Sequence, residues 1–126
     1  MALVLDAGGL IAIDRGDRFV GPMLRLAFAS GIPVVTSAAV LAQVWRRGAR
    51  QAVLARTLRG VRVQALDAIA GRRVGELLAS TGTADVVDAH LASLVNLGDT
   101  VLTSDEPDIR QLLAARALVD VRLVVV

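Results

Sequence analysis

The sequence contains no cysteine, no lysine and no tyrosine, and aromatic residues make up only 2% of it. The lack of cysteine excludes disulfide bonds, thiolate metal ligands and thiol nucleophiles. The lack of lysine excludes Schiff-base chemistry, a phosphate-binding-loop lysine and the lysine that completes a phosphotransfer site of the receiver kind. All 14 basic residues are therefore arginines. The remaining candidates for chemistry are carboxylates, hydroxyls and one histidine.

An uninterrupted membrane-spanning run is also missing. Segment 26–45 has no charged side chain and is long enough to cross a membrane if it formed one helix. Gly31 and Pro33 break it, however, so it is better interpreted as a helix end, a turn, a short strand and a new helix. Segment 1–6 lacks the positive start and the long apolar stretch of a secretory signal. We therefore expect a cytoplasmic protein without a membrane segment.

The overall composition indicates one globular domain. Hydrophobic residues make up 55% of the 126 residues, which is ample apolar surface for a core. The length fits a single domain that spans residues 1–126. The formal net charge of +2 permits an anionic partner such as nucleic acid, but does not require one.

Short apolar segments alternate with helical ones along the chain. The expected strands are 2–5, 34–35, 61–66, 101–102 and 123–126, and the expected helices are 10–13, 19–29, a helix capped by Ser37, 49–58, 67–80, 84–97 and one that starts at Pro107. Strands that alternate with helices predict an α/β fold whose mainly parallel sheet carries helices on both faces.

Four aspartates are placed where such a fold gathers its chemistry. Asp6 follows the first strand and Asp105 follows the fourth, at the carboxyl ends of parallel strands. Asp85 and Asp88 stand three residues apart, which predicts that they project from one face of a helix. Like charges at ~4 Å repel by ~4 kcal/mol at an effective dielectric of 20, so converging carboxylates need a cation or raised pKa values. An oxygen-only site suits Mg²⁺ or Mn²⁺.

Ordinary structural roles are the alternative for three of these residues. Asp6 and Asp105 could each cap the helix that follows, and Asp85 could favour a helix N-terminus through the helix dipole. Asp88 lies further along a mostly apolar helix, where capping does not explain it.

Four ordered segments resemble the motifs of a PIN domain, and most of all the VapC-type toxins of bacterial toxin–antitoxin pairs. They are residues 3–7, 37–45, 84–92 and 102–108. The resemblance spans nearly the whole chain. It implies a single three-layer α/β/α domain, a ribonuclease that depends on Mg²⁺ or Mn²⁺, a homodimer and a small antitoxin protein as partner.

The resemblance also assigns residues to the site. Asp6, Asp88 and Asp105 match the family's acidic residues, which implies that they are catalytic and bind the metal. Where the family usually carries a glutamate, this chain has Gln43, whose amide can donate a hydrogen bond but adds no negative charge. Asp85 could supply the missing carboxylate as a further metal ligand.

Two hydroxyl residues precede Asp105. In the metal-dependent interpretation, Thr103 or Ser104 would contact the phosphate or a metal-bound water. The alternative is ordinary hydrogen bonding at a strand end. His90, the only histidine, stands two residues from Asp88, which on a helix turns it away from the acidic face. We therefore expect a structural role for His90.

A basic segment follows the second motif. Trp45 precedes Arg46, Arg47 and Arg50, which could stack on and neutralise an RNA strand. The alternative is a solvated basic face beside a tryptophan of the core or of a dimer interface.

The sequence thus predicts a metal-dependent endoribonuclease that cleaves single-stranded or loop RNA. The alternative is a PIN-fold module that binds RNA or protein with weak or no nuclease activity, because Gln43 replaces an acidic residue. A receiver-type phosphotransfer domain is disfavoured by the missing lysine.

Overall fold

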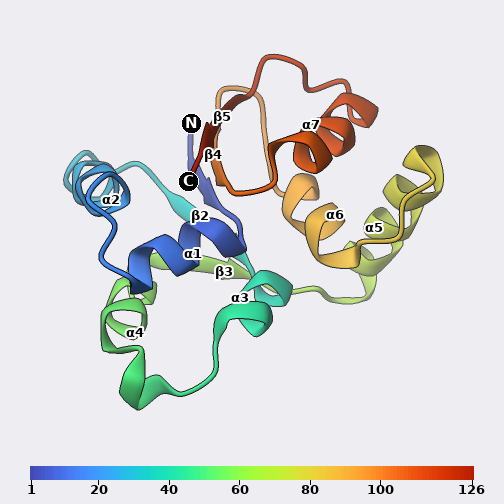
Figure 1. Ribbon diagram of the computed structural model, residues 1–126. Helices are drawn as coiled ribbons and strands as arrows, with labels where there is room; N and C mark the ends of the chain where they lie inside the picture. Colours follow the sequence, from blue (N-terminus) through green and yellow to red (C-terminus); the bar gives the residue numbers. More distant parts are fainter.

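The structure is a computed structural model that describes residues 1–126. Strands and helices alternate along the chain (Figure 1). The strands are β1 (Leu3–Leu5), β2 (Val34–Ser37), β3 (Val61–Gln64), β4 (Thr100–Thr103) and β5 (Arg122–Val125). The helices are α1 (Ala7–Asp14), α2 (Val20–Ala29), α3 (Ala38–Val44), the 3₁₀ turn η1 (Gly48–Arg50), α4 (Ala52–Leu58), α5 (Ala68–Thr81), α6 (Val86–Ser93) and α7 (Glu106–Ala115).

The five strands form one parallel sheet in the order β3-β2-β1-β4-β5. Helices α1, α2 and α4 lie on one side of the strands, and α5, α6 and α7 lie on the other (Figure 1). Strand β1 is central, with Leu5 paired to Thr36 of β2 and to Leu102 of β4. All three residues of β1 are buried because both sheet faces are covered. The predicted α/β fold with a mainly parallel sheet is confirmed.

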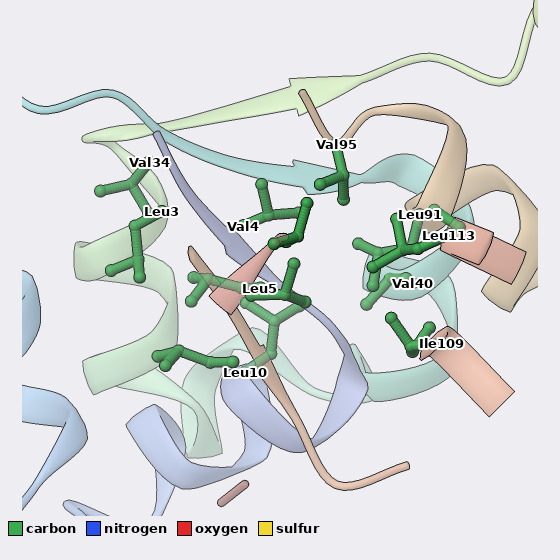
Figure 2. Packing of buried hydrophobic residues seen from close by; sticks show 14 of the residues in the cluster. Leu3, Val4, Leu5, Leu10, Val34, Val40, Leu91, Val95, Ile109 and Leu113 are labelled. Atoms are coloured by element: carbon green, nitrogen blue, oxygen red, sulfur yellow. The ribbon is translucent and has the colours of Figure 1, made fainter. Parts of the chain in front are cut away.

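The core joins both helical layers to the sheet. Leu10 of α1 packs near Leu5, while Val40 of α3 lies with Leu91 of α6 and Ile109 of α7 (Figure 2). These five side chains are almost completely buried. Burial of one such side chain stabilises the fold by about 2 kcal/mol relative to exposure.

Helix α6 is shorter than the helix 84–97 that the sequence suggests. It ends at Ser93, and the guanidinium group of Arg116 donates hydrogen bonds of 2.6 Å to the carbonyls of Ala92 and Val95. These bonds satisfy carbonyls at the helix end, so the chain can turn towards β4 without a further helical turn. The prediction failed here because Arg116 is remote in sequence.

Segment 26–45 lies within this fold as the end of α2, a turn, β2 and α3, which matches the interpretation from the sequence. The longest helix, α5, has 14 residues. No helix combines the length and the apolar character that crossing a membrane requires.

Candidate metal centre

The carboxyl ends of β1 and β4 meet at one edge of the sheet. The two strands are neighbours, and the Asp6 amide donates a hydrogen bond of 3.1 Å to the Leu102 carbonyl. Asp6 follows β1 directly, and Asp105 stands two residues after the end of β4. The topology therefore brings the first and last of the acidic motifs to the same edge.

Asp6 is buried at this edge, with 5% of its surface exposed. Its Oδ1 accepts the Gly9 amide at 3.0 Å, which caps α1, and its Oδ2 accepts the Ser104 amide at 3.2 Å. Asp6 thus has the capping role that the sequence left open. Each carboxylate oxygen has two lone pairs, so these bonds leave acceptor capacity for a cation.

Three other aspartates converge beside it. One carboxylate oxygen from each of Asp88, Asp105 and Asp108 lies within 4.8 Å of the others. Asp88 comes from the first turn of α6, Asp108 from the first turn of α7, and Asp105 from the N-cap position of α7. The side chain of Asp105 makes no capping hydrogen bond, so the capping alternative does not hold for this residue.

The cluster is electrostatically strained. Burial, followed by the charge of Asp85 and then by other nearby carboxylates, raises the pKa of Asp88 from 3.8 to about 6. Burial and the neighbouring Asp108 carboxylate also raise the pKa of Asp105, with smaller contributions from Asp6 and Asp85. The five aspartates are therefore close enough for their negative charges to interact, and a bound cation would relieve their repulsion.

Asp85 and Gln43 do not belong to the converging group of three. Asp85 is the N-cap of α6, where its Oδ1 accepts the Asp88 amide at 2.9 Å. It acts on Asp88 through this bond and through its charge, and it lies before the helix rather than on its face. Gln43 is exposed on α3 and makes no side-chain hydrogen bond.

Asp108 is the residue of the cluster that sequence reasoning missed. It stands three residues after Asp105, and Pro107 marks the start of a helix between them. This spacing places both carboxylates on one side of the first helical turn, so the signal was available. Glu106 in the same turn pairs instead with Arg110 at 2.6 Å.

The two hydroxyls before Asp105 differ in their surroundings. Thr103 is completely buried, and its Oγ1 accepts the Asp105 amide at 2.9 Å, which is ordinary hydrogen bonding at a strand end. Ser104 is exposed, and its hydroxyl makes no hydrogen bond within the chain. Of the two, only Ser104 presents a free hydroxyl.

His90 lies in the core, as expected, and not in the acidic cluster. It is completely buried, and its Nδ1 is 2.6 Å from the Ser37 hydroxyl. That hydroxyl already accepts the amides of Ala39 and Val40, so it donates its own hydrogen to Nδ1. Burial lowers the pKa of His90, in agreement with a neutral ring.

The basic segment is held by a buried glutamine. Gln51 accepts the amides of Arg46 and Arg47 at 2.9 and 3.2 Å and donates to the Val44 carbonyl at 3.0 Å. The guanidinium group of Arg46 donates hydrogen bonds to two backbone carbonyls at the end of α3, at 3.0 and 2.7 Å. Arg47 and Arg50 are exposed and form no salt bridge, so they are free to meet an anion.

Comparison with known proteins gives a structural relationship only. No family model and no curated protein matches the sequence. The structure is similar to a chain in the crystal structure of VapBC2 from Rickettsia felis bound to a DNA fragment from their promoter, with a TM-score of 0.67 and 17% sequence identity. The match covers 100% of this chain and 99% of the other. The chain therefore has a PIN-like fold of the kind found in VapBC2, as its ordered motifs predict.

Proposed function

We propose that the protein is a metal-dependent endoribonuclease that acts as a VapC-like toxin on single-stranded or loop RNA. The observation that carries the proposal is the convergence of Asp88, Asp105 and Asp108 within 4.8 Å at the carboxyl edge of a parallel sheet. The full-length similarity to a chain of a VapBC2 structure supports the toxin assignment.

The donor set fits Mg²⁺ or Mn²⁺. Three carboxylates supply oxygen atoms only, which hard divalent cations prefer, and no thiolate is present. Asp88, Asp105 and Asp108 would hold the ion, with Asp6 beside them and with Asp85 contributing its charge. Such an ion supplies Lewis-acid stabilisation of a phosphate and activation of a water molecule.

The remaining roles belong to side chains around the cluster. Because its pKa is raised to about 6, Asp88 keeps its proton in the metal-free protein below about pH 6 and releases it above that pH. The free hydroxyl of Ser104 would donate to a phosphate oxygen, whereas Thr103 is buried and acts only through the backbone. Arg47 and Arg50 would neutralise phosphates of the RNA strand, and Arg46 would hold the segment in place.

The proposed partners are RNA, a small antitoxin protein and a second copy of the chain. The antitoxin is supported by the similar structure, which is described as a VapBC2 complex with promoter DNA. The homodimer is supported by large apolar side chains on the surface: Phe19, Leu26 and Leu97 are 82%, 67% and 71% exposed. Contiguous apolar patches often mark interfaces, and Leu26 lines an apolar groove together with Met1, Met23 and Ile32.

Cleavage of a labelled stem-loop RNA tests the proposed function. We expect cleavage with Mg²⁺ or Mn²⁺, none in excess EDTA, and none by Asp88→Asn with either ion. Arg110→Gln is a matched control, because its salt bridge with Glu106 is exposed. Full cleavage in EDTA would falsify the proposal.

The second candidate is a PIN-fold module that binds RNA or protein without appreciable nuclease activity. It is favoured by Gln43, which brings no carboxylate to the site. Mn²⁺ titration by calorimetry separates the two functions. A nuclease should bind Mn²⁺ and lose this binding in Asp88→Asn, whereas a binding module should retain RNA affinity in Asp88→Asn and in EDTA.

A further inference from the structure

The first turn of α1 lies unusually close to the loop between β4 and α7. A Cβ atom placed on Gly8 would lie 2.5 Å from Ser104 Oγ, 2.6 Å from its Cβ and 2.9 Å from its backbone nitrogen. Atoms cannot approach this closely without a shift, and one of the three belongs to the backbone. The loop therefore occupies the space that any side chain at position 8 would need.

Glycine is required at position 8 for space and not for backbone conformation. Gly8 is not among the residues with positive φ. Its neighbour Gly9 differs, because a Cβ there would lie 3.4 Å from the nearest atoms, an ordinary van der Waals contact. Only Gly8 in this turn is sterically necessary for the approach of Ser104.

Ser104 links two parts of the acidic site. Its amide donates to Asp6 Oδ2 at 3.2 Å, and the next residue is Asp105. The 3.2 Å bond is already long for an amide donor, so a further displacement of the loop would break it. The packing of Ser104 against α1 therefore determines where Asp105 lies relative to Asp6.

We propose that Gly8 is a positioning residue for the acidic site. Because Gly8 has no side chain, Ser104 can pack directly against α1, and this packing keeps Asp105 beside Asp6 and Asp88. The effect of Gly8 on the position of the loop that carries Ser104 follows from the geometry of the metal-free chain. The expected effect on metal affinity rests on the proposed function.

Four variants test this inference: Gly8→Ala, Ser104→Gly, the double variant, and Gly75→Ala as a control. Gly75 is exposed in α5, where a Cβ would meet nothing within 4 Å, so this control shares the change in helix propensity without the steric effect. Amide hydrogen exchange at position 104 and thermal melting are measured without metal. The Mn²⁺ affinity is then measured by calorimetry.

We expect Gly8→Ala to speed exchange at position 104 and to weaken Mn²⁺ binding at least tenfold, whereas Gly75→Ala changes neither. The double variant should recover part of the loss, because Ser104→Gly removes the two closest contacts and leaves the 2.9 Å contact with the backbone nitrogen of residue 104. If Gly8→Ala fails to fold, a folded double variant supports the same steric coupling.

Three results would overturn the inference. They are unchanged exchange and affinity in Gly8→Ala, a loss that the double variant does not reduce at all, and a double variant that is as destabilised as the single one. If the parent protein itself binds no Mn²⁺, the proposed function fails. The exchange data at position 104 then still decide whether Gly8 positions the loop.

Discussion

The carboxylate of Asp85 accepts the backbone amide of Asp88 at 2.9 Å, so one acidic residue of the site caps the helix that carries another. The same carboxylate raises the pKa of Asp88 through its charge. Asp85 therefore has a structural and an electrostatic role, and a suitable substitution can separate them.

Asp85→Asn should preserve stability, whereas Asp85→Ala should lower it by about 1 kcal/mol. Asparagine caps a helix as well as aspartate does, while alanine provides no acceptor for the Asp88 amide. Both variants remove the charge, so both should lower the pKa of Asp88. Thermal melts and a carboxyl NMR titration measure the two effects. A loss of Mn²⁺ affinity of more than tenfold in Asp85→Asn would instead show that Asp85 is a ligand.

Asp88→Asn should stabilise the metal-free protein at pH 7.5. Because the folded-state pKa of Asp88 is raised to about 6, its contribution to stability is fully present below pH 3.8 and is lost as pH rises through about 6. Asparagine cannot ionise and avoids that loss. The side chain is partly exposed, so we expect a gain of about 1 kcal/mol, or roughly 4 °C in Tm.

The pH dependence of this gain provides the check. Melting curves of parent and variant, recorded in EDTA from pH 4 to 8, should converge towards pH 4, separate progressively up to about pH 6 and keep a constant difference above it. Mn²⁺ should reverse the order at pH 7.5, since it would stabilise only the parent. Equal stability at all pH values would mean that folding does not raise the pKa of Asp88.

Asp6→Asn should have the opposite effect on the metal-free protein. Both carboxylate oxygens of Asp6 accept backbone amides, from Gly9 and Ser104, and an asparagine side chain offers only one acceptor. One of these two amides, which are buried or partly buried, then loses its partner, which costs about 1–3 kcal/mol. Chemical denaturation in EDTA measures this loss. A variant as stable as the parent would show that the loop adapts without the second bond.

The sequence predicted the fold and the edge of the sheet where the acidic residues meet, but not the composition of the cluster. Alternating strands and helices placed Asp6 and Asp105 correctly because parallel strands share a carboxyl edge. The sequence left the role of Asp85 open between a metal ligand and a helix N-terminus, because one residue separates a cap from a helical face; the helix begins at Val86, which makes Asp85 the cap. The end of α6 depended on Arg116, a tertiary contact that no local pattern contains.

Asp108→Asn should weaken Mn²⁺ binding about as much as Asp105→Asn, by roughly tenfold or more, because each contributes one oxygen to the same group. Asp108 is exposed on α7, so the fold should be unaffected. The calorimetric affinities of both variants are compared with that of Asp120→Asn, an acidic residue outside the cluster. An affinity for Asp108→Asn equal to the parent value would remove Asp108 from the proposed site.

Gln43→Glu should tighten Mn²⁺ binding and raise cleavage at limiting metal. Gln43 is the position where the resemblance places a glutamate, on the helix that follows β2, and α3 packs against α1 and α6, the helices that follow Asp6 and Asp85. Asp85 is already engaged by the Asp88 amide, so it is poorly placed to replace the missing carboxylate.

Gln43→Ala is the matched control, since it also alters an exposed side chain but adds no charge. Lower metal-free stability of Gln43→Glu with no gain in affinity would indicate repulsion from a site that Asp85 already completes. Affinities unchanged in both variants would show that position 43 does not reach the metal.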